Sequence, residues 1–247
     1  MSELRVTARR MNAVTNLLIE GRREVEIDWW WLSDSEGRRL SKKGANKFLL
    51  ACILDYQIPA EQAWENARRL AEDVLGDPPD LWDVIAGYAE DEWDGKFRVF
   101  RLHRFPAAHK RVWRIGRDIV ASYDGDARKI WAGASVAEVQ ERFDELHLGA
   151  QLGRMAIGAL LDTGQISGKS DVKADVHVRR VLGRIMVGRM LSEDEATKLT
   201  RQMYPSNPWL LDGQLYWLGK SACSAREPDC DECMASEVCA FCTSGHA

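Results

Sequence analysis

The sequence predicts an all-α protein, and three observations support this class. Apolar residues recur three and four positions apart over most of the chain, which is the spacing of one face of a helix. Prolines and glycines interrupt these segments at short intervals, as they do between helices. Runs in which apolar and polar residues alternate, the pattern of a strand, are scarce. We therefore expect helices that pack on one another rather than on a sheet.

Eight segments carry the helical pattern clearly. In chain order they cover residues 44–56, 60–75, 81–88, 109–123, 136–146, 153–161, 176–187 and 192–204. One more helix is expected before residue 44. Ser135 and Ser192 are the expected N-caps of the helices that follow them, and Glu195 stands three residues after Ser192, as in a capping box.

The composition excludes several classes of protein. The chain has 247 residues, of which 45% are hydrophobic and 29% charged, as in a soluble protein with one large or two small cores. Its longest apolar run, Phe48 to Leu54, has seven residues, whereas a helix that crosses a bilayer needs roughly 20. The start of the chain lacks the apolar block and cleavage site of a secretory signal. We expect a protein of the cytoplasm, with no membrane partner.

The net charge of −4 conceals an uneven distribution of charged residues. Residues 55–94 hold twelve acidic side chains against two arginines, whereas residues 96–117 hold eight lysines and arginines and no acid. Aromatic residues interrupt the basic segment and can hold it on a core. A segment of one sign can neutralise phosphates from one side, so it predicts a nucleic-acid interface. For the acidic segment, a surface that is only exposed to solvent is as good an interpretation as a functional one.

The cysteines predict a metal centre near the end of the chain. Five of the six lie in the last 25 residues, and four of them have the spacing C-x6-C-x2-C-x5-C. These four are Cys223, Cys230, Cys233 and Cys239. Four thiolates at these separations can surround one metal centre, so the chemistry allows zinc or an iron-sulfur cluster, with the cluster favoured. Cys242 is then a spare thiol, and Cys52 is expected to be a small core residue.

Two further segments carry polar groups at the start of expected helices. Residues 148–161 read LGAQLGRMAIGALL, a helix that opens with glycines whose backbone amides can face an anion. Residues 172–184 read VKADVHVRRVLGR, in which Asp175 precedes a helix rich in arginine. Taken alone, an aspartate at this position is most often only an N-cap.

Together these segments resemble the helix-hairpin-helix DNA glycosylase superfamily, in particular its endonuclease III branch. The cysteine tail is similar to the [4Fe-4S] loop of that branch at every spacing. ADVHVRRVLGR resembles the family segment V-D-T-H-V-x-R-V, and LGAQLGRMAIGALL resembles the hairpin L-P-G-V-G-R-K-T-A. FLLACILDYQ shows a weaker similarity to the family's L-L-S-A-Q segment. The resemblance covers residues 44–239.

The resemblance implies two helical domains that flank a DNA-binding cleft. Residues 44–164 would form one domain, with the helix-hairpin-helix motif near residues 146–161. Residues 1–43 and 165–247 would form the other, with the iron-sulfur cluster loop at residues 223–239. Residues 1–43 have no counterpart in the resemblance. Their Trp29-Trp30-Trp31 run could stack on a flipped base, although a core role is the more common one for such a run.

The resemblance also implies the site residues and the partner. Asp175 falls on the catalytic aspartate, and the four cysteines fall on the ligands of a [4Fe-4S] cluster. The expected DNA-binding residues are Gln57, Gln151, Gly153, Arg154, Met155, Lys173, His177 and Arg180. Gln57 is the candidate wedge that fills the gap left by a flipped base, unless it only ends a helix before Pro59. The implied partner is double-stranded DNA with a damaged or mismatched base, bound by a monomer.

Departures from the family pattern narrow the implied activity. Ala150 and Gln151 replace the proline and first glycine of the hairpin, and Met155 replaces the lysine that acts as a Schiff-base nucleophile. Because a thioether cannot attack a sugar carbon as an amine does, we expect a monofunctional glycosylase. Two alternatives stay open: a lesion-binding protein without catalysis, and a glycosylase that cuts the strand through another amine such as Lys173. The identity of the excised base is not predicted.

Overall fold

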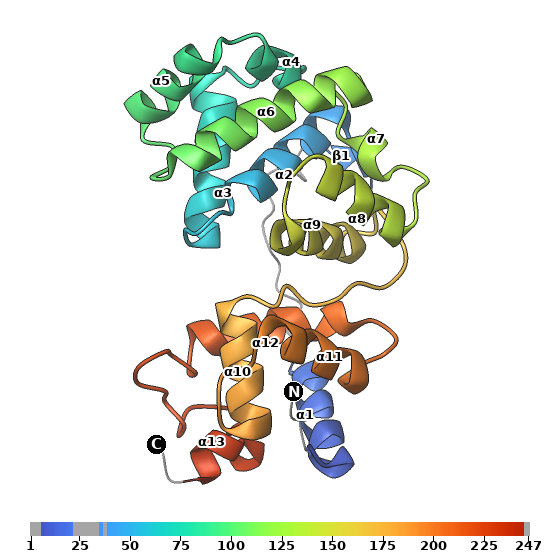
Figure 1. The fold of residues 1–247 in the computed structure, drawn as a ribbon, viewed down its shortest axis with the longest axis vertical. Coiled ribbons are helices and arrows are strands. Elements are labelled where there is room, and N and C mark those ends of the chain that lie inside the picture. The colour runs from blue at the N-terminus through green and yellow to red at the C-terminus, as the bar shows by residue number, and fades with distance from the viewer. Residues whose placement is uncertain (1–5, 22–34, 37–38, 245–247) are drawn as a thin grey trace. The chain divides into compact units, whose positions relative to one another are not determined.

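The structure is a computed structural model of the chain, and it describes residues 6–21, 35–36 and 39–244. The Trp29-Trp30-Trp31 run lies outside the described residues. Helices dominate the described part of the chain, which confirms the predicted all-α class (Figure 1). A two-stranded hairpin, β1 (Ser35–Glu36) and β2 (Arg39–Leu40), is the sheet seen among these residues. Within the same residues, no helix has both the length and the apolar character needed to cross a bilayer.

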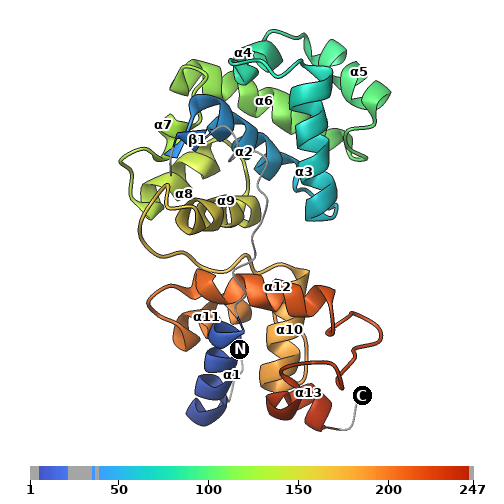
Figure 2. The same ribbon diagram turned by 180° about the vertical axis from the view of Figure 1, so that it is seen from behind.

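The chain divides into two compact units, the first of which spans residues 27–168 and so extends beyond the expected 44–164 on both sides. After the hairpin, its helices are α2 (Lys42–Leu54), α3 (Ala60–Arg68), the π-helical turn η2 (Arg69–Val74), α4 (Leu81–Ala86), α5 (Glu90–Phe100), α6 (Pro106–Tyr123), α7 (Arg128–Trp131), α8 (Val136–Glu145) and α9 (Ala150–Asp162). Helices α8 and α9 pack against each other and form the expected helix-hairpin-helix (Figure 2).

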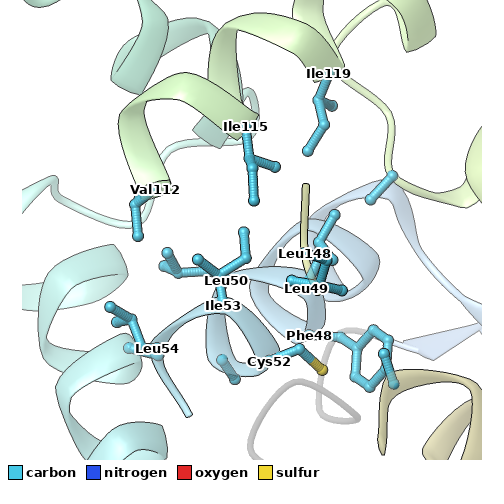
Figure 3. Packing of buried hydrophobic residues seen from close by; sticks show 14 of the residues in the cluster. Phe48, Leu49, Leu50, Cys52, Ile53, Leu54, Val112, Ile115, Ile119 and Leu148 are labelled. Atoms are coloured by element: carbon cyan, nitrogen blue, oxygen red, sulfur yellow. The ribbon is translucent and has the colours of Figure 1, made fainter. Parts of the chain in front are cut away.

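Helix α2 forms the centre of this unit. Every residue from Gly44 to Leu54 is buried, so the helix is enclosed on all sides rather than along one stripe. It contacts α3, α4, α6, α7 and α9. Figure 3 shows Leu50 and Ile53 of α2 pointing towards Val112 and Ile115 of α6. Cys52 is 3% exposed within this core, as the sequence predicts.

The second unit joins the N-terminal helix to the C-terminal part of the chain. It contains α1 (Ala8–Glu20), α10 (Val176–Val187), α11 (Glu193–Met203), the 3₁₀ turn η3 (Pro208–Leu211), α12 (Asp212–Lys220), the 3₁₀ turn η4 (Ser236–Val238) and α13 (Ala240–Thr243). Helix α10 packs on α12 and α13, and it also contacts α1 and α11 (Figures 1 and 2). Val14 and Leu18 of α1 are fully buried in this core, together with Val178 and Leu182 of α10.

Helices α5 and α12 were not among the predicted segments. Helix α5 begins with three acidic residues, Glu90 to Glu92, which stabilise its positive end. Gly95 and several charged residues interrupt its apolar pattern, so periodicity does not predict this helix. Because α5 continues to Phe100, the basic segment 96–117 is not one continuous face. It is divided among the end of α5, a loop at residues 101–105 and α6.

Both expected N-caps are confirmed, each as a full capping box. The Ser135 side chain accepts from the Glu138 N–H, and the Ser192 side chain accepts from the Glu195 N–H. In each case the glutamate side chain accepts from the backbone N–H of the cap. Glu195 also bonds Arg189, with 2.7 Å between Oε1 and Nη2. The Arg189 guanidinium and then the Ser192 N–H lower the pKa of Glu195 to about 2.

We expect Glu195→Gln to weaken the second unit in a pH-dependent way. The ionised form of Glu195 is favoured in the folded state, so its contribution is present above its usual pKa near 4.5 and is lost as the pH falls towards 2. The variant should lose about 1 kcal/mol of unfolding free energy at neutral pH and almost nothing near pH 2, measured by urea denaturation. Glu138→Gln is the control, because Glu138 shares the capping role but hydrogen-bonds no arginine. An equal pH dependence for both variants would contradict the ion pair's contribution.

Candidate functional site

Asp175 is the N-cap of α10, and the helix fixes one oxygen of its carboxylate. Oδ1 accepts hydrogen bonds from the backbone N–H groups of His177 at 2.8 Å and Val178 at 3.0 Å. The side chain is half-buried and lies at the positive end of the helix dipole. The preceding segment is anchored as well, because the backbone N–H of Lys173 donates to Asp212 Oδ1 of α12 at 2.7 Å. The structure therefore holds a carboxylate at a defined place and orientation.

The side chains of His177 and Arg180 lie against α12 and the chain that follows it. Arg180 Nη2 donates to the carbonyl of Gly219 at 2.9 Å, and Arg180 Nε donates to the carbonyl of Cys223 at 3.0 Å. Arg180 Nη2 also lies 3.1 Å from His177 Nδ1. Gly219 is needed here, since a Cβ at this position would lie 2.7 Å from His177 Nδ1.

This placement does not match the expected DNA contact of Arg180. The side chain is 7% exposed, and its guanidinium serves backbone carbonyls of the same unit. Arg184, one turn further along α10, acts in the same way by donating from Nη2 to the carbonyl of Ala225 at 2.9 Å. Two arginines of α10 thus hold the start of the cysteine loop. Arg184 also contacts the other end of this loop, because its guanidinium lies 4.9 Å from the Phe241 ring.

The cysteines of the tail line one small pocket. Cys223 and Cys239 are buried and Cys233 is half-buried, and all three carry free thiols. Burial raises the pKa of the Cys233 thiol, and the nearby Cys223 and Cys239 raise it further. Cys230, however, forms a disulfide with Cys242.

The donor chemistry of this pocket fits a thiolate-bound metal centre, but the arrangement in this structure does not. The cavity among the cysteines has a volume of about 10 Å³, roughly the space of one water molecule. Among the described residues, no group of three or more histidine, cysteine or acidic side chains is placed to hold a metal ion. The sequence predicts Cys242 only as a spare thiol. Its C-x2-C spacing from Cys239 was the signal that could have placed it in the pocket.

The hairpin residues lie in the first unit. The turn between α8 and α9 ends at Gly149, whose φ of +86° suits glycine, and no side chain caps the start of α9. Gly153 allows the two helices to approach, because a Cβ there would lie 3.0 Å from Gln140 Nε2. Gln151, Arg154 and Met155 are half-buried in the first turns of α9, and Met155 packs against the core. The anion-binding role expected for the amides at the start of α9 stays a prediction.

Gln57 lies on the surface of the same unit, three residues after α2. It has a left-handed backbone with φ of +55°, and its carbonyl accepts a hydrogen bond of 2.6 Å from Arg104 Nη2. Arg104 belongs to the loop at residues 101–105, which begins with another left-handed residue, Arg101, at φ of +51°. Local sequence patterns do not predict this contact, because the two residues are 47 positions apart.

His109 of α6 holds the loop at residues 101–105 against α5. Its Nδ1 lies 2.9 Å from Asp94 Oδ1 and its Nε2 lies 2.9 Å from the carbonyl oxygen of His103. The hydrogen bond from His109, together with the charge of Arg98, lowers the pKa of Asp94. A cavity of about 410 Å³ opens beside the loop, and Arg98, Arg101, His103, Arg104 and His109 are among the residues that line it. Gln57 is thus bonded to a basic loop held by a buried histidine.

Comparison with known proteins places these features in a family, although no protein-family model matches the chain. An endonuclease III of Rickettsia felis is 32% identical over 183 residues, which cover 73% of this chain and 78% of the relative. An endonuclease III of Thermotoga maritima is 22% identical over 183 residues, which cover 74% of this chain and 73% of the relative.

Solved structures share the fold. A trapped covalent endonuclease III–DNA intermediate, described as an estranged-adenine complex, matches with a TM-score of 0.68 at 15% identity, covering 98% of this chain and 100% of the other. A non-covalent endonuclease III–DNA complex matches with a TM-score of 0.66 at 14% identity, covering 97% and 98%. A thermostable thymine-DNA glycosylase matches with a TM-score of 0.65 at 14% identity, covering 96% and 98%.

The sequence relationship to the Rickettsia protein extends over most of both chains, and the fold agrees with it over nearly the whole length. The chain therefore belongs to the endonuclease III family, within the helix-hairpin-helix superfamily of DNA glycosylases that act in base excision repair.

Proposed function

We propose that the protein is a monofunctional DNA glycosylase, which hydrolyses the N-glycosidic bond of a damaged or mismatched base flipped out of duplex DNA. The observation that carries this proposal is the Asp175 carboxylate at the start of α10. One of its oxygens is fixed by two backbone N–H groups, and the residue occupies the position of the catalytic aspartate in a segment that resembles the family's.

The chemistry requires a negative charge held below the sugar. Breaking the bond between C1′ and the base develops positive charge on the ring, and a fixed carboxylate stabilises that charge without having to reorient. Because Oδ1 of Asp175 is engaged by the helix, Oδ2 is the oxygen that we assign to the sugar or to the attacking water. Asp175 can in this way serve as both electrostatic stabiliser and general base.

Two surfaces of the first unit are assigned to DNA binding. The uncapped start of α9, at Ala150 and Gln151, would bind a backbone phosphate through its amides. Gln57, hydrogen-bonded to Arg104, would enter the duplex where the base is extruded, with the basic loop beside it. In the second unit, Lys173 is assigned to a phosphate near Asp175. His177, whose backbone N–H donates to Asp175, is assigned to the same DNA surface. The protein would act as a monomer on DNA within the cell.

The absence of an amine at residue 155 is the reason why we propose a monofunctional rather than a bifunctional glycosylase. A bifunctional glycosylase attacks the sugar with a lysine and forms a Schiff base, which leads to strand cleavage. Met155 occupies that position in α9 and has no nucleophilic nitrogen. Water activated at Asp175 is then the attacking group, and the product is an abasic site in an intact strand.

We further propose that Cys223, Cys230, Cys233 and Cys239 bind a [4Fe-4S] cluster when all four thiols are free. Support comes from their spacing, which is similar to that of the family's loop, and from the shared pocket that they line. When bound, the cluster would supply no chemistry to the excised base. It would order the loop that Arg180 and Arg184 connect to α10.

Asp175→Asn should abolish base release and leave DNA binding unchanged or tighter. Asparagine is also a good N-cap, so α10 should keep its start while the negative charge is lost. We expect the single-turnover excision rate on lesion-bearing duplexes to fall by at least about a hundredfold. Asp194→Asn, at an exposed position of α11 in the same unit, is the control. Excision by Asp175→Asn at the wild-type rate would remove the proposed mechanism, and wild-type protein that binds every lesion tested without releasing a base would favour the non-catalytic alternative.

Met155→Lys should confer strand cleavage on the substrate that wild-type protein only excises. The new amine would stand where the family places its nucleophile, and borohydride should then trap the protein on DNA. Met155→Leu serves as the control for repacking of the half-buried side chain. If wild-type protein is itself trapped by borohydride, another amine such as that of Lys173 attacks the sugar, and the monofunctional assignment is wrong.

Gln57→Ala should slow excision from fully paired duplexes more than from a lesion in single-stranded DNA. The reason is that a wedge lowers the cost of extruding a paired base, whereas an unpaired base needs no wedge. Arg104→Gln, which removes the guanidinium bonded to the Gln57 carbonyl, should shift the two rates in the same direction. Gln62→Ala, on neighbouring α3, is the matched control. Equal slowing on both substrates would argue against the role of Gln57 as a wedge.

A further inference from the structure

The cluster pocket contains one more thiol than the proposed cluster needs. Cys242 lines the same cavity as Cys223, Cys230, Cys233 and Cys239. It lies on α13, whose N-cap is Cys239, so the first turn of the helix separates the two cysteines. The position of Cys242 in the pocket therefore follows from the local helix.

The five thiols are not equivalent. Cys223 and Cys239 are 8% and 4% exposed, and both contact Arg184: Cys223 Sγ lies 3.5 Å from Arg184 Nη1, and Cys239 Sγ lies 3.5 Å from the Arg184 carbonyl. Cys230 and Cys242 are half-buried, with Cα atoms 6.0 Å apart, and they are joined by a disulfide. This Cα separation is within the usual range for a disulfide. Cys230, Cys233 and Cys242 are thus the half-buried cysteines of the pocket, and two of these three are the ones joined.

We propose that Cys242 is a redox partner for Cys230, and that the disulfide between them is a cluster-free, protected state of the pocket which must be reduced before a cluster can bind. This inference rests on the proposed [4Fe-4S] centre. With the disulfide closed, three free thiols remain and the cavity has room for about one water molecule. A cluster held by four thiolates cannot form in that state.

The oxidation step balances with a peroxide as the oxidant. The two S–H bonds of Cys230 and Cys242 are broken and one S–S bond is formed. Hydrogen peroxide receives the two electrons and the two protons and becomes two molecules of water. A dithiol reductant reverses the step by exchange, in which its own two thiols become a cyclic disulfide. The thiols of Cys230 and Cys242 are thereby kept from oxidation beyond the disulfide, which is irreversible or nearly so.

The sequence allows the pairing to be mapped in the full-length protein. Cleavage after Arg226, Glu232 and Glu237 places Cys230, Cys233 and Cys239 on three different peptides, with Cys242 on the last. The chain would be purified without oxygen and loaded with iron and sulfide. The cluster would then be removed with a chelator, and the protein treated with hydrogen peroxide and digested without reductant for mass spectrometry. Cys242→Ser and, as a matched control in the other unit, Cys52→Ala would be treated in parallel.

We expect the peptide of Cys230 to be linked to the last peptide in the wild type and in Cys52→Ala, and the link to be lost in Cys242→Ser. Reloading after peroxide, followed by broad visible absorbance, should require dithiothreitol in the wild type. Cys242→Ser should show no such requirement at a mild peroxide dose, because no disulfide blocks Cys230. At a higher dose, from which the wild type recovers with dithiothreitol, the variant should lose reloading irreversibly, because Cys230 lacks the partner that stops its oxidation at the disulfide. Circular dichroism of each variant before treatment checks that the fold is retained.

Two results would overturn the inference while leaving the cofactor in place. One is the wrong pairing: a wild type that takes up the cluster but shows no Cys230–Cys242 link after cluster removal and oxidation, or a link that persists in Cys242→Ser because Cys230 pairs with Cys239. The other is a link that has no effect on reloading. A wild type that never takes up iron and sulfide, or that binds zinc instead, overturns the cofactor proposal and with it the protective role of the disulfide.

Discussion

The candidate site depends on helix α10 and on the hydrogen bonds that its two arginines donate to backbone carbonyls. Arg180 and Arg184 are four residues apart, so they lie on one face of the helix and reach the same neighbouring chain. Their acceptors are the carbonyls of Gly219, Cys223, Ser224 and Ala225. Loss of the Arg180 guanidinium would leave the buried carbonyls of Gly219 and Cys223 without this donor, which costs more than a hydrogen bond contributes. Asp175 at the start of α10 and the cysteine loop are consequently held by one element.

That arrangement explains why a cysteine loop can matter for chemistry in which it takes no part. The loop packs on the same helix whose first N–H groups fix the carboxylate of Asp175. Any change in the loop that shifts α10 also shifts the carboxylate, and transition-state stabilisation by a fixed charge is sensitive to small displacements. The cysteine loop is therefore best regarded as part of the support of Asp175.

Local sequence patterns predicted the features that depend on neighbouring residues. The bounds of α10, Val176–Val187, the N-caps Ser135 and Ser192, and the capping box of Ser192 with Glu195 follow from helix periodicity and from these residue types at fixed spacing. The all-α class came from helix periodicity. The family came from the resemblance of the cysteine tail and two helical segments, with a weaker similarity at FLLACILDYQ. The sequence could not show that Arg180 points inward, because its acceptor Gly219 is 39 residues away. The contact of Arg104 with Gln57 and the disulfide of Cys230 with Cys242 likewise depend on how the chain folds back.

The left-handed backbone at Gln57 and Arg101 has a consequence for DNA binding. A non-glycine residue in this conformation costs about 1 kcal/mol or more, so it persists only where neighbouring contacts hold it. Here those contacts are the Arg104 hydrogen bond to Gln57 and the bond between His109 and the carbonyl of His103. Both loops thus have their shape in the free protein. Folding has already ordered them, so a duplex that bound at this proposed surface would lose little further chain entropy of the protein.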